Sequence, residues 1–294
     1  MFESISNASD SLYSKHQENL KKNYPGLKKE TFRRELQSYI GEFISANQLV
    51  DSIIQAKINT FEDLVLRGIP FQHISGVAHF YGREFICSEK VLIPRQETEV
   101  LVEEVIKSFR TKNSIKALDL CTGSGCIGLT LACELRDNLS SMTLTDISLD
   151  ALSVLKQNID KFEYQYSKSL KLDVIHSDLF ERINGTYDLI VSNPPYIKKD
   201  NHIDMVHSQV LDFEPHVALF VDDSEYEGFF CKLFTGARGA LEAKGVFMME
   251  GHEDEIHLLG RKWNSLFKDD IVQVLNDLTG RPRFLKIIKD SKRG

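Results

Sequence analysis

The sequence predicts an α/β fold in which a seven-stranded sheet carries helices on both faces. Apolar runs of strand length recur from residue 116 to the C-terminus, and helical patterns fill most of the gaps between them. Residues 189–191 are apolar on both faces, as in a buried strand of a parallel sheet. We expect a small helical bundle and a β-hairpin to precede this doubly wound sheet.

Residues 1–78 have apolar side chains at helical intervals, clearest in YPGLKKETFRRELQSYIGEFISANQLVDSIIQAKI. Pro25 and Gly26 interrupt the pattern. Thr60, followed by Asp63, predicts the start of a helix in TFEDLVLRG that ends at Gly68. We therefore predict an N-terminal helical bundle, with substrate docking as its expected role.

Residues 79–95 alternate aromatic and β-branched side chains around Gly82 in HFYGREFICSEKVLIPR, which predicts a β-hairpin linker. Residues 96–294 then form the predicted sheet domain. Its strands are expected at residues 116–121, 142–146, 172–178, 187–193, 245–251, 270–277 and 284–289, with a clear helix at 227–243.

The last two strands are separated only by TGRPR, which is too short for a parallel crossover, so they should pair as an antiparallel hairpin. Arg281 and Arg283 lie in or beside this turn, where we expect them to be solvated.

The composition is that of a globular protein, with 42% hydrophobic and 27% charged residues. No apolar stretch approaches the ~20 residues of a membrane span, and the N-terminus has no leader pattern, so we expect a cytoplasmic protein. Five cysteines and nine histidines show no metal-ligand spacing, so no metal is expected.

The net charge of -7 is unevenly distributed along the chain. Residues 1–78 hold nine Lys or Arg and nine Asp or Glu, so the whole excess of negative charge lies in residues 79–294. A protein that binds duplex nucleic acid normally has a basic face. We therefore expect no direct contact with nucleic acid.

The first strand of the sheet domain runs into DLCTGSGCIG, in which Gly123, Gly125 and Gly128 spell GxGxxG. Such a loop indicates a nucleotide-type cofactor, because glycine lets the backbone approach a ligand closely. Asp146 ends the second strand, where an acidic side chain can bond ribose hydroxyls. Dinucleotides and S-adenosylmethionine both fit this pattern.

Asp119 favours S-adenosylmethionine, since a carboxylate repels a pyrophosphate but stabilises a sulfonium and an amino group. The alternative role is capping of the loop's N–H groups. Asp178 ends the third strand, where it can meet an adenine amine while Leu179 covers the ring. The alternative there is a carboxylate that caps the following turn.

The fourth strand ends in NPPY, residues 193–196. Asn193 Oδ1 and the carbonyl oxygen of Pro194 are acceptors only, so they can bond the two N–H groups of a planar NH2 and aim its lone pair at a methyl donor. The Pro194–Pro195 turn holds these acceptors rigidly, and Tyr196 offers a flat face. Adenine, guanine and the glutamine amide all carry such a group.

The motifs DLCTGSG, LTD, HSD and NPPY, with IPRQETE, PFQHISGVAHFYGREF and FEPHVAL, resemble those of the HemK/PrmC family of peptide chain release factor glutamine methyltransferases. The resemblance runs from about residue 60 to the C-terminus. It implies a Rossmann-like methyltransferase fold and methylation of the glutamine in the Gly-Gly-Gln motif of release factors. The family usually has glycine where Cys121 stands and proline where Gln96 stands.

The resemblance also implies site residues. Cofactor contacts would come from Asp146, Leu179, Asn193 and the loop Cys121, Thr122, Gly123, Ser124 and Gly125. The glutamine amide would be held by Asn193, Pro194, Pro195 and Tyr196, and the protein is expected to be a monomer.

Three alternatives remain. A methyltransferase acting on adenine or guanine amines would use the same NPPY, but it must flip a base and hold a backbone, which the acidic sheet domain disfavours. A noncatalytic adaptor would be expected to have lost the cofactor and NPPY motifs, which are intact in this sequence. A dinucleotide oxidoreductase would leave NPPY without a role.

Overall fold

The structure is a computed structural model that describes residues 2–44 and 51–291. Two compact units divide the chain. The first comprises Met1–Val77, Cys87–Glu89 and Val206–Glu214, and the second comprises Ala78–Ile86, Lys90–Met205 and Pro215–Gly294. The docking role of the N-terminal part and the exact three-part division stay predictions.

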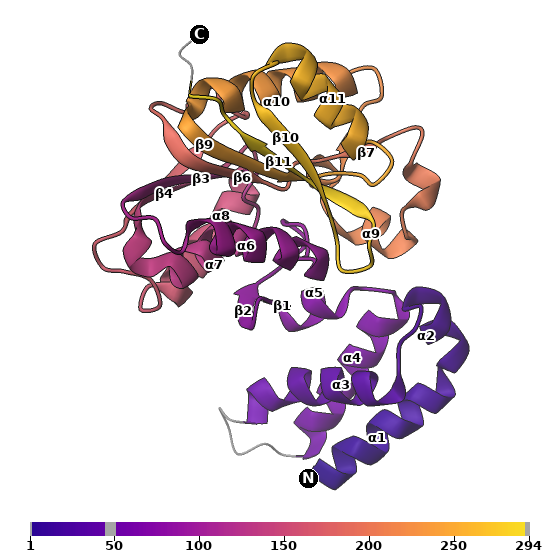
Figure 1. The fold of residues 1–294 in the computed structure, drawn as a ribbon. Helices are drawn as coiled ribbons and strands as arrows, with labels where there is room; N and C mark the ends of the chain where they lie inside the picture. The colour runs from indigo at the N-terminus through magenta and orange to yellow at the C-terminus, as the bar shows by residue number, and fades with distance from the viewer. Residues whose placement is uncertain (1, 45–50, 292–294) are drawn as a thin grey trace. The chain divides into compact units, whose positions relative to one another are not determined.

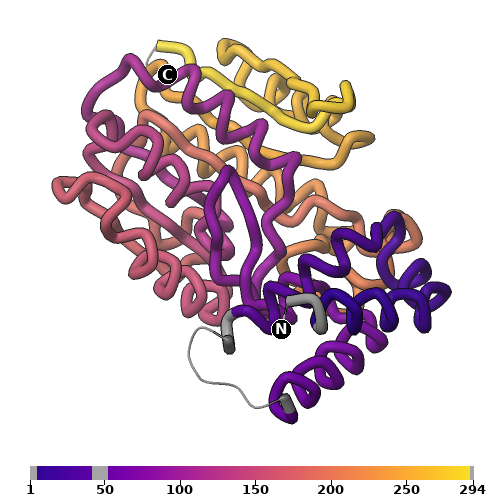
Figure 2. The backbone as a smooth tube through the Cα atoms, turned by 90° about the horizontal axis from the view of Figure 1, so that it is seen from below, coloured from indigo at the N-terminus to yellow at the C-terminus, as the bar shows by residue number. Residues whose placement is uncertain are grey.

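The first unit is helical, as the sequence predicts (Figure 2). Its apolar stripes meet in one core, in which Leu36, Ile40 and Phe61 are almost fully buried. Tyr24 contributes both a ring stacked on Phe71 and a hydroxyl that donates to the carbonyl oxygen of Ile69 at 2.6 Å. Its helices are α1 (Phe2–Lys15), α2 (Gln17–Asn23), α3 (Lys29–Ile44), α4 (Asp51–Leu66), α5 (Phe71–Ser75) and α9 (Ser208–Phe213).

The predicted helix start at Thr60 is wrong. Helix α4 runs through this position without a break, and the Thr60 hydroxyl donates back to the carbonyl oxygen of Ala56 at 2.9 Å. A threonine inside a helix can satisfy its hydroxyl in this way, so the capping pattern alone does not locate a helix end. The break at Pro25 and Gly26 is confirmed, whereas residues 45–50 of the predicted pattern lie outside the described residues.

The predicted β-hairpin is confirmed as β1 (Val77–Phe80) and β2 (Arg83–Ile86). Tyr81 and Gly82 form its two-residue turn with φ of 50° and 71°, the left-handed conformation that such turns require. Phe85 packs its ring 4.7 Å from that of Phe162, in the core of the second unit.

The second unit is built on the predicted seven-stranded sheet, in the order β10-β11-β9-β6-β3-β4-β5 (Figure 1). Strand β11 runs antiparallel to both β10 and β9. The predicted final hairpin, formed by β10 and β11, is therefore confirmed. The strands are β3 (Ile115–Leu120), β4 (Leu139–Asp146), β5 (Lys171–His176), β6 (Tyr187–Ser192), β9 (Leu241–Glu250), β10 (Ile271–Asn276) and β11 (Pro282–Ile288). Short segments are β7 (Ile197–Lys198), β8 (Phe220–Val221) and the 3-10 turns Arg136–Asn138, Ile203–Met205 and His216–Ala218.

Helices cover both faces of this sheet (Figure 1). One face packs against α6 (Gln96–Phe109), α7 (Cys126–Leu135) and α8 (Leu149–Phe162), and the other against α10 (Tyr226–Ala240) and α11 (Ile256–Leu266). The helix predicted at residues 227–243 ends three residues early, because Leu241 already pairs with Tyr187 in the sheet. Trp263 of α11 is fully buried among aromatic rings of the second face.

The strand order reverses at β3, which leads to β4 and β5 on one side and to β6 and β9 on the other. In open α/β sheets ligands bind outside the carboxyl ends of the strands at such a point. Within the described part of the chain, no helix is long and apolar enough to cross a bilayer.

Candidate active site

A cavity of about 360 Å³ lies at the carboxyl ends of β3, β4, β5 and β6. Its size and largely apolar walls suit a nucleoside-sized ligand. The predicted site residues that line it are Cys121, Thr122, Gly123, Ser124, Asp146, Asp178, Leu179, Asn193 and Pro195. The predicted residues outside its lining are Asp119, Gly125, Pro194 and Tyr196.

The glycine loop between β3 and α7 forms one wall of the cavity. Gly123 and Gly125 adopt φ of 56° and 84°, which explains glycine at both positions. A Cβ atom on Gly125 would lie 2.4 Å from Leu155 Cδ1, so this glycine packs the loop against α8. The loop is tied to β4 by the Thr122 N–H, which donates to the carbonyl oxygen of Thr145 at 2.9 Å.

Cys121 begins this loop with φ of 60°, a conformation that is uncommon for any residue with a side chain. Glycine would adopt it without strain, which gives a physical reason for glycine as the usual family residue here. Burial raises the pKa of the Cys121 thiol, so the side chain is a neutral thiol that packs in the site.

We predict that Cys121→Gly is more stable to chemical denaturation than Cys121→Ala by about 1 kcal/mol, the cost of a left-handed conformation for a residue with a Cβ. Both changes remove the sulfur, so their difference reports the net effect of a Cβ atom on a left-handed backbone. Equal free energies of unfolding for the two variants would show that this position is unstrained. Titration with S-adenosylmethionine should show tighter binding by the glycine variant, because its loop adjusts freely.

Asp119 lies outside the cavity lining, at the end of β3. Its side chain is fully buried, and Oδ2 accepts hydrogen bonds from Thr122 Oγ1 at 2.6 Å and from the Gly128 N–H at 2.9 Å. Burial raises its pKa to about 7. These bonds anchor the loop to the start of α7, in keeping with the alternative role, and contact of Asp119 with S-adenosylmethionine stays a prediction.

Asp146 ends β4 and lines the cavity, as predicted. Its Oδ2 accepts from the Gly123 N–H and its Oδ1 from the Ser148 N–H, both at 2.9 Å. Burial raises the pKa of Asp146, while these N–H groups oppose the rise. The bond to ribose hydroxyls stays a prediction, and the remaining lone pairs of this carboxylate are available for it.

Asp178 and Leu179 line the cavity beyond β5. Asp178 Oδ2 forms an ion pair with Lys232 Nζ at 2.8 Å, instead of capping the following turn. Leu179 is buried with φ of 46°, and the Ser177 hydroxyl fixes this turn by donating to the Leu179 carbonyl oxygen at 3.0 Å. Contact of these two residues with an adenine ring stays a prediction.

The NPPY turn follows β6 directly, because Pro194 cannot donate to the ladder. Ser192 Oγ ties the strand end to β3 by donating to the Leu120 carbonyl oxygen at 2.8 Å. Asn193 and Pro195 then reach the cavity, while Pro194 is buried. The turn is thus held rigidly from behind, and Asn193 presents its amide to the ligand space.

Sequence reasoning missed two residues that lie next to the NPPY turn, Thr98, which lines the cavity, and Glu250, which does not. Thr98 Oγ1 accepts from Asn193 Nδ2 at 3.4 Å and donates to Glu250 Oε2 at 2.6 Å. Burial raises the pKa of Glu250, against the hydrogen bond from Thr98 and the charge of Arg283. The sequence did offer one signal for Glu250. It ends the apolar run GVFMME, and a carboxyl group buried at the end of such a strand needs hydrogen-bond partners.

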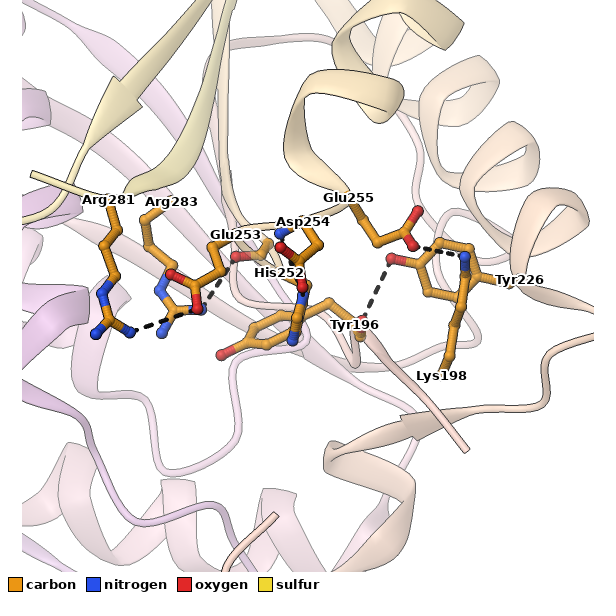
Figure 3. A network of polar contacts seen from close by, with 10 residues as sticks. Tyr196, Lys198, Tyr226, His252, Glu253, Asp254, Glu255, Arg281 and Arg283 are labelled. Atoms are coloured by element: carbon orange, nitrogen blue, oxygen red, sulfur yellow. Dashed lines mark hydrogen bonds and ion pairs between the residues drawn. The ribbon is translucent and has the colours of Figure 1, made fainter. Parts of the chain in front are cut away.

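Tyr196 is not among the residues that line the cavity, and its side chain lies near that of Arg283 (Figure 3). Its hydroxyl donates to Glu250 Oε1 at 2.9 Å, and the Arg283 guanidinium carbon lies 5.9 Å from its ring centroid. Arg283 is partly buried, so the expectation of a solvated side chain is wrong there, whereas Arg281 is 65% exposed and pairs with Glu253. Arg283 belongs to β11, which packs beside β9 and so brings it under the NPPY turn.

The chain beyond Tyr196 is also fixed by polar contacts (Figure 3). Tyr226 donates its hydroxyl proton to the Tyr196 carbonyl oxygen at 3.3 Å. Lys198 pairs with Glu255 at 2.6 Å and lies over the Tyr226 ring. In residues 2–44 and 51–291, no group of three or more His, Cys, Asp or Glu side chains is placed to hold a metal ion.

Residues 96–214 match the family model described as methyltransferase small domain. The chain is 38% identical over 221 residues to the release factor glutamine methyltransferase of Koribacter versatilis, covering 74% of this chain and 73% of that protein. It is 36% identical over 225 residues to the bifunctional methyltransferase of Rickettsia typhi, covering 69% of this chain and 42% of that protein. The chain thus spans about half the length of the bifunctional relatives that it matches.

Among solved structures, a methyltransferase from Pyrococcus furiosus is similar in fold, with a TM-score of 0.50 and 18% sequence identity. The similarity covers 72% of this chain and 91% of that chain. It shows that the two chains share a fold over these residues.

Proposed function

The chain belongs to the family of release factor glutamine methyltransferases, and on this premise we propose that it transfers a methyl group from S-adenosylmethionine to the glutamine side-chain amide in the Gly-Gly-Gln motif of a peptide chain release factor. The observation that carries the proposal is the position of Asn193. Its amide stands at the cavity wall, at the end of β6, in a turn that two prolines make rigid.

The residues of the cavity fit S-adenosylmethionine. Two carboxylates, Asp146 and Asp178, stand at its wall, where they suit ribose hydroxyls and an amine better than a phosphate. Gly123 lets the backbone approach the ligand, and Leu179 supplies an apolar surface. When bound, S-adenosylmethionine supplies an electrophilic methyl group on a positively charged sulfur.

The chemical task of the protein is to make an amide nitrogen nucleophilic. The nitrogen lone pair is delocalised into the carbonyl, and no ordinary side chain can remove the proton at neutral pH. Asn193 Oδ1 and the Pro194 carbonyl oxygen each accept one N–H of the substrate amide, which favours pyramidal nitrogen and orients its lone pair. The fixed turn does this without reorganisation during the reaction.

The proposed partner is the release factor, and the proposed docking surface is the N-terminal helical unit. We also propose that the reaction takes place in the cytoplasm, where translation termination occurs, and that the protein is a monomer. A nucleic-acid substrate is disfavoured by charge, because residues 79–294 carry the whole net charge of -7.

The test is a peptide-resolved mass measurement after incubation with a release factor and S-adenosylmethionine. We predict a mass gain of one methylene unit, confined to the Gly-Gly-Gln peptide and absent when that glutamine is replaced by alanine. Glycines beside the glutamine let the substrate backbone approach the Pro194–Pro195 turn closely. Methyl incorporation into DNA or ribosomal RNA, with none into the release factor, would overturn the proposal.

A further inference from the structure

Beside Asn193 the second unit contains a short chain of hydrogen bonds between three elements that are distant in sequence, and its middle member, Thr98, also lines the cavity. Asn193 Nδ2 donates to Thr98 Oγ1 at 3.4 Å, and the Thr98 hydroxyl donates to Glu250 Oε2 at 2.6 Å. The other oxygen of Glu250 accepts from the Tyr196 hydroxyl at 2.9 Å. Thr98 lies in the first turn of α6, and Glu250 ends β9.

We infer that Thr98 and Glu250 are positioning residues that decide which end of the Asn193 amide faces the substrate, an inference that rests on the proposed function. An asparagine amide has one acceptor end and one donor end, and the two have nearly the same shape. A turn that fixes the backbone of Asn193 therefore leaves the amide free to rotate by half a turn. Only one of the two orientations presents an acceptor to a substrate NH2.

The direction of each hydrogen bond follows from the carboxylate. Glu250 accepts from the Thr98 hydroxyl with one oxygen and from the Tyr196 hydroxyl with the other, so the single proton of the Thr98 hydroxyl points at Glu250. The lone pairs of Thr98 Oγ1 are then left for Asn193, and only its Nδ2 end can donate to them. Asn193 Oδ1 is consequently turned away from Thr98, free to accept from the substrate amide.

Burial makes this arrangement selective. Thr98 and Glu250 are 2% and 1% exposed, so water cannot readily supply the partners that the protein withholds. If the Asn193 amide rotated, its oxygen would face the oxygen of Thr98 and two acceptors would meet. Such an unsatisfied buried contact disfavours the unproductive orientation.

The same carboxylate limits what Tyr196 can do. The Tyr196 hydroxyl donates its proton to Glu250. Burial raises the pKa of Tyr196, so the phenol is neutral. The phenol is therefore not a proton donor toward the substrate, and its ring and backbone are what remain to contact it. Glu250 thus holds both ends of the NPPY turn, Asn193 through Thr98 and Tyr196 directly.

The matched variants Thr98→Val and Thr98→Ser test this role. Valine keeps the shape of threonine without an acceptor, whereas serine keeps the hydroxyl. We expect Thr98→Val to lower the single-turnover rate of methyl transfer to the release factor about 10-fold, the effect of one lost hydrogen bond in the transition state. Thr98→Ser should stay within about 3-fold of the unmodified protein, and affinity for S-adenosylmethionine should change little in either variant.

A readout that needs no activity is the ¹⁵N-edited NMR signal of the Asn193 side-chain amide, assigned by its absence in Asn193→Ala. It should shift in Thr98→Val and keep its position in Thr98→Ser. Equal rates for Thr98→Val and the unmodified protein, equal impairment of both variants, or an unmoved amide signal would each overturn the inference. An unmodified protein that methylates no release factor would instead overturn the proposed function, while the amide signal still tests the orientation.

Discussion

Asn193→Ala is expected to lower the single-turnover rate of methyl transfer at least ~100-fold, the scale of losing a preorganised polar group in a reaction centre. The substitution removes the acceptor that orients the substrate nitrogen, and the cavity itself is otherwise kept. Since the glycine loop, Asp146, Asp178 and most of the other lining residues are unchanged, affinity for S-adenosylmethionine should be largely retained in calorimetry.

Asn201→Ala is a matched control for this experiment. Asn201 is an exposed asparagine of the same unit whose amide donates to Asp223, and neither of these two residues lines the cavity. Its loss should leave the rate within about 2-fold, as for most surface substitutions. Near-normal single-turnover rates in Asn193→Ala would remove Asn193 from the mechanism.

The centre of the sheet was predictable because its strands are apolar on both faces, a pattern that differs clearly from that of exposed segments. Residues 189–191 show this, since every one of them is fully buried in β6. Strand and helix ends were less predictable. The helix expected to reach residue 243 gives way to β9 at Leu241, because pairing with Tyr187 across the sheet outweighs the local helical pattern.

The position of the site was predictable from the carboxyl ends of the strands, but side-chain directions were not. Asp119 illustrates the difference. Leu118 and Leu120 pack into the core under α10 and α11, so the alternation of a strand turns Asp119 to the opposite face, against α7. Only the position of α7 in the folded domain shows that the Gly128 N–H donates to Asp119.

Thr98 and Glu250 could not be predicted as partners from this one sequence. They are 152 positions apart, and nothing local to either position indicates the other. The contact exists because α6 and β9 pack together in the folded domain. Tertiary packing therefore decides the orientation of the Asn193 side-chain amide, although the NPPY motif itself can be recognised in the sequence.

Gly128→Ala is the second substitution for which we expect a large effect. Gly128 lies in α7, and a Cβ atom built there would stand 2.3 Å from Leu144 Cδ2 and 2.8 Å from Asp119 Oδ2. Both neighbours are fully buried, so one of them must move. Overpacking of this kind destabilises a core by about 1–3 kcal/mol, which thermal or chemical denaturation will measure.

The damage should extend to the cofactor site, because Asp119 Oδ2 also lies within 3 Å of the built Cβ atom, and a shift of Asp119 breaks its bonds to Thr122 and Gly128. We therefore expect affinity for S-adenosylmethionine to fall by about 10-fold or more, corresponding to one or two lost buried hydrogen bonds.

Gly239→Ala separates this effect from the general consequence of replacing a helical glycine. Gly239 lies in α10, is exposed, and has no atom within 4 Å of a built Cβ. Alanine there should stabilise the protein by about 0.5–1 kcal/mol through helix propensity and leave ligand binding unchanged. If Gly128→Ala instead kept its affinity while losing stability, the Asp119 anchor would not govern the loop, and the cavity wall would have to be held by Asp146 and the β4 contacts alone.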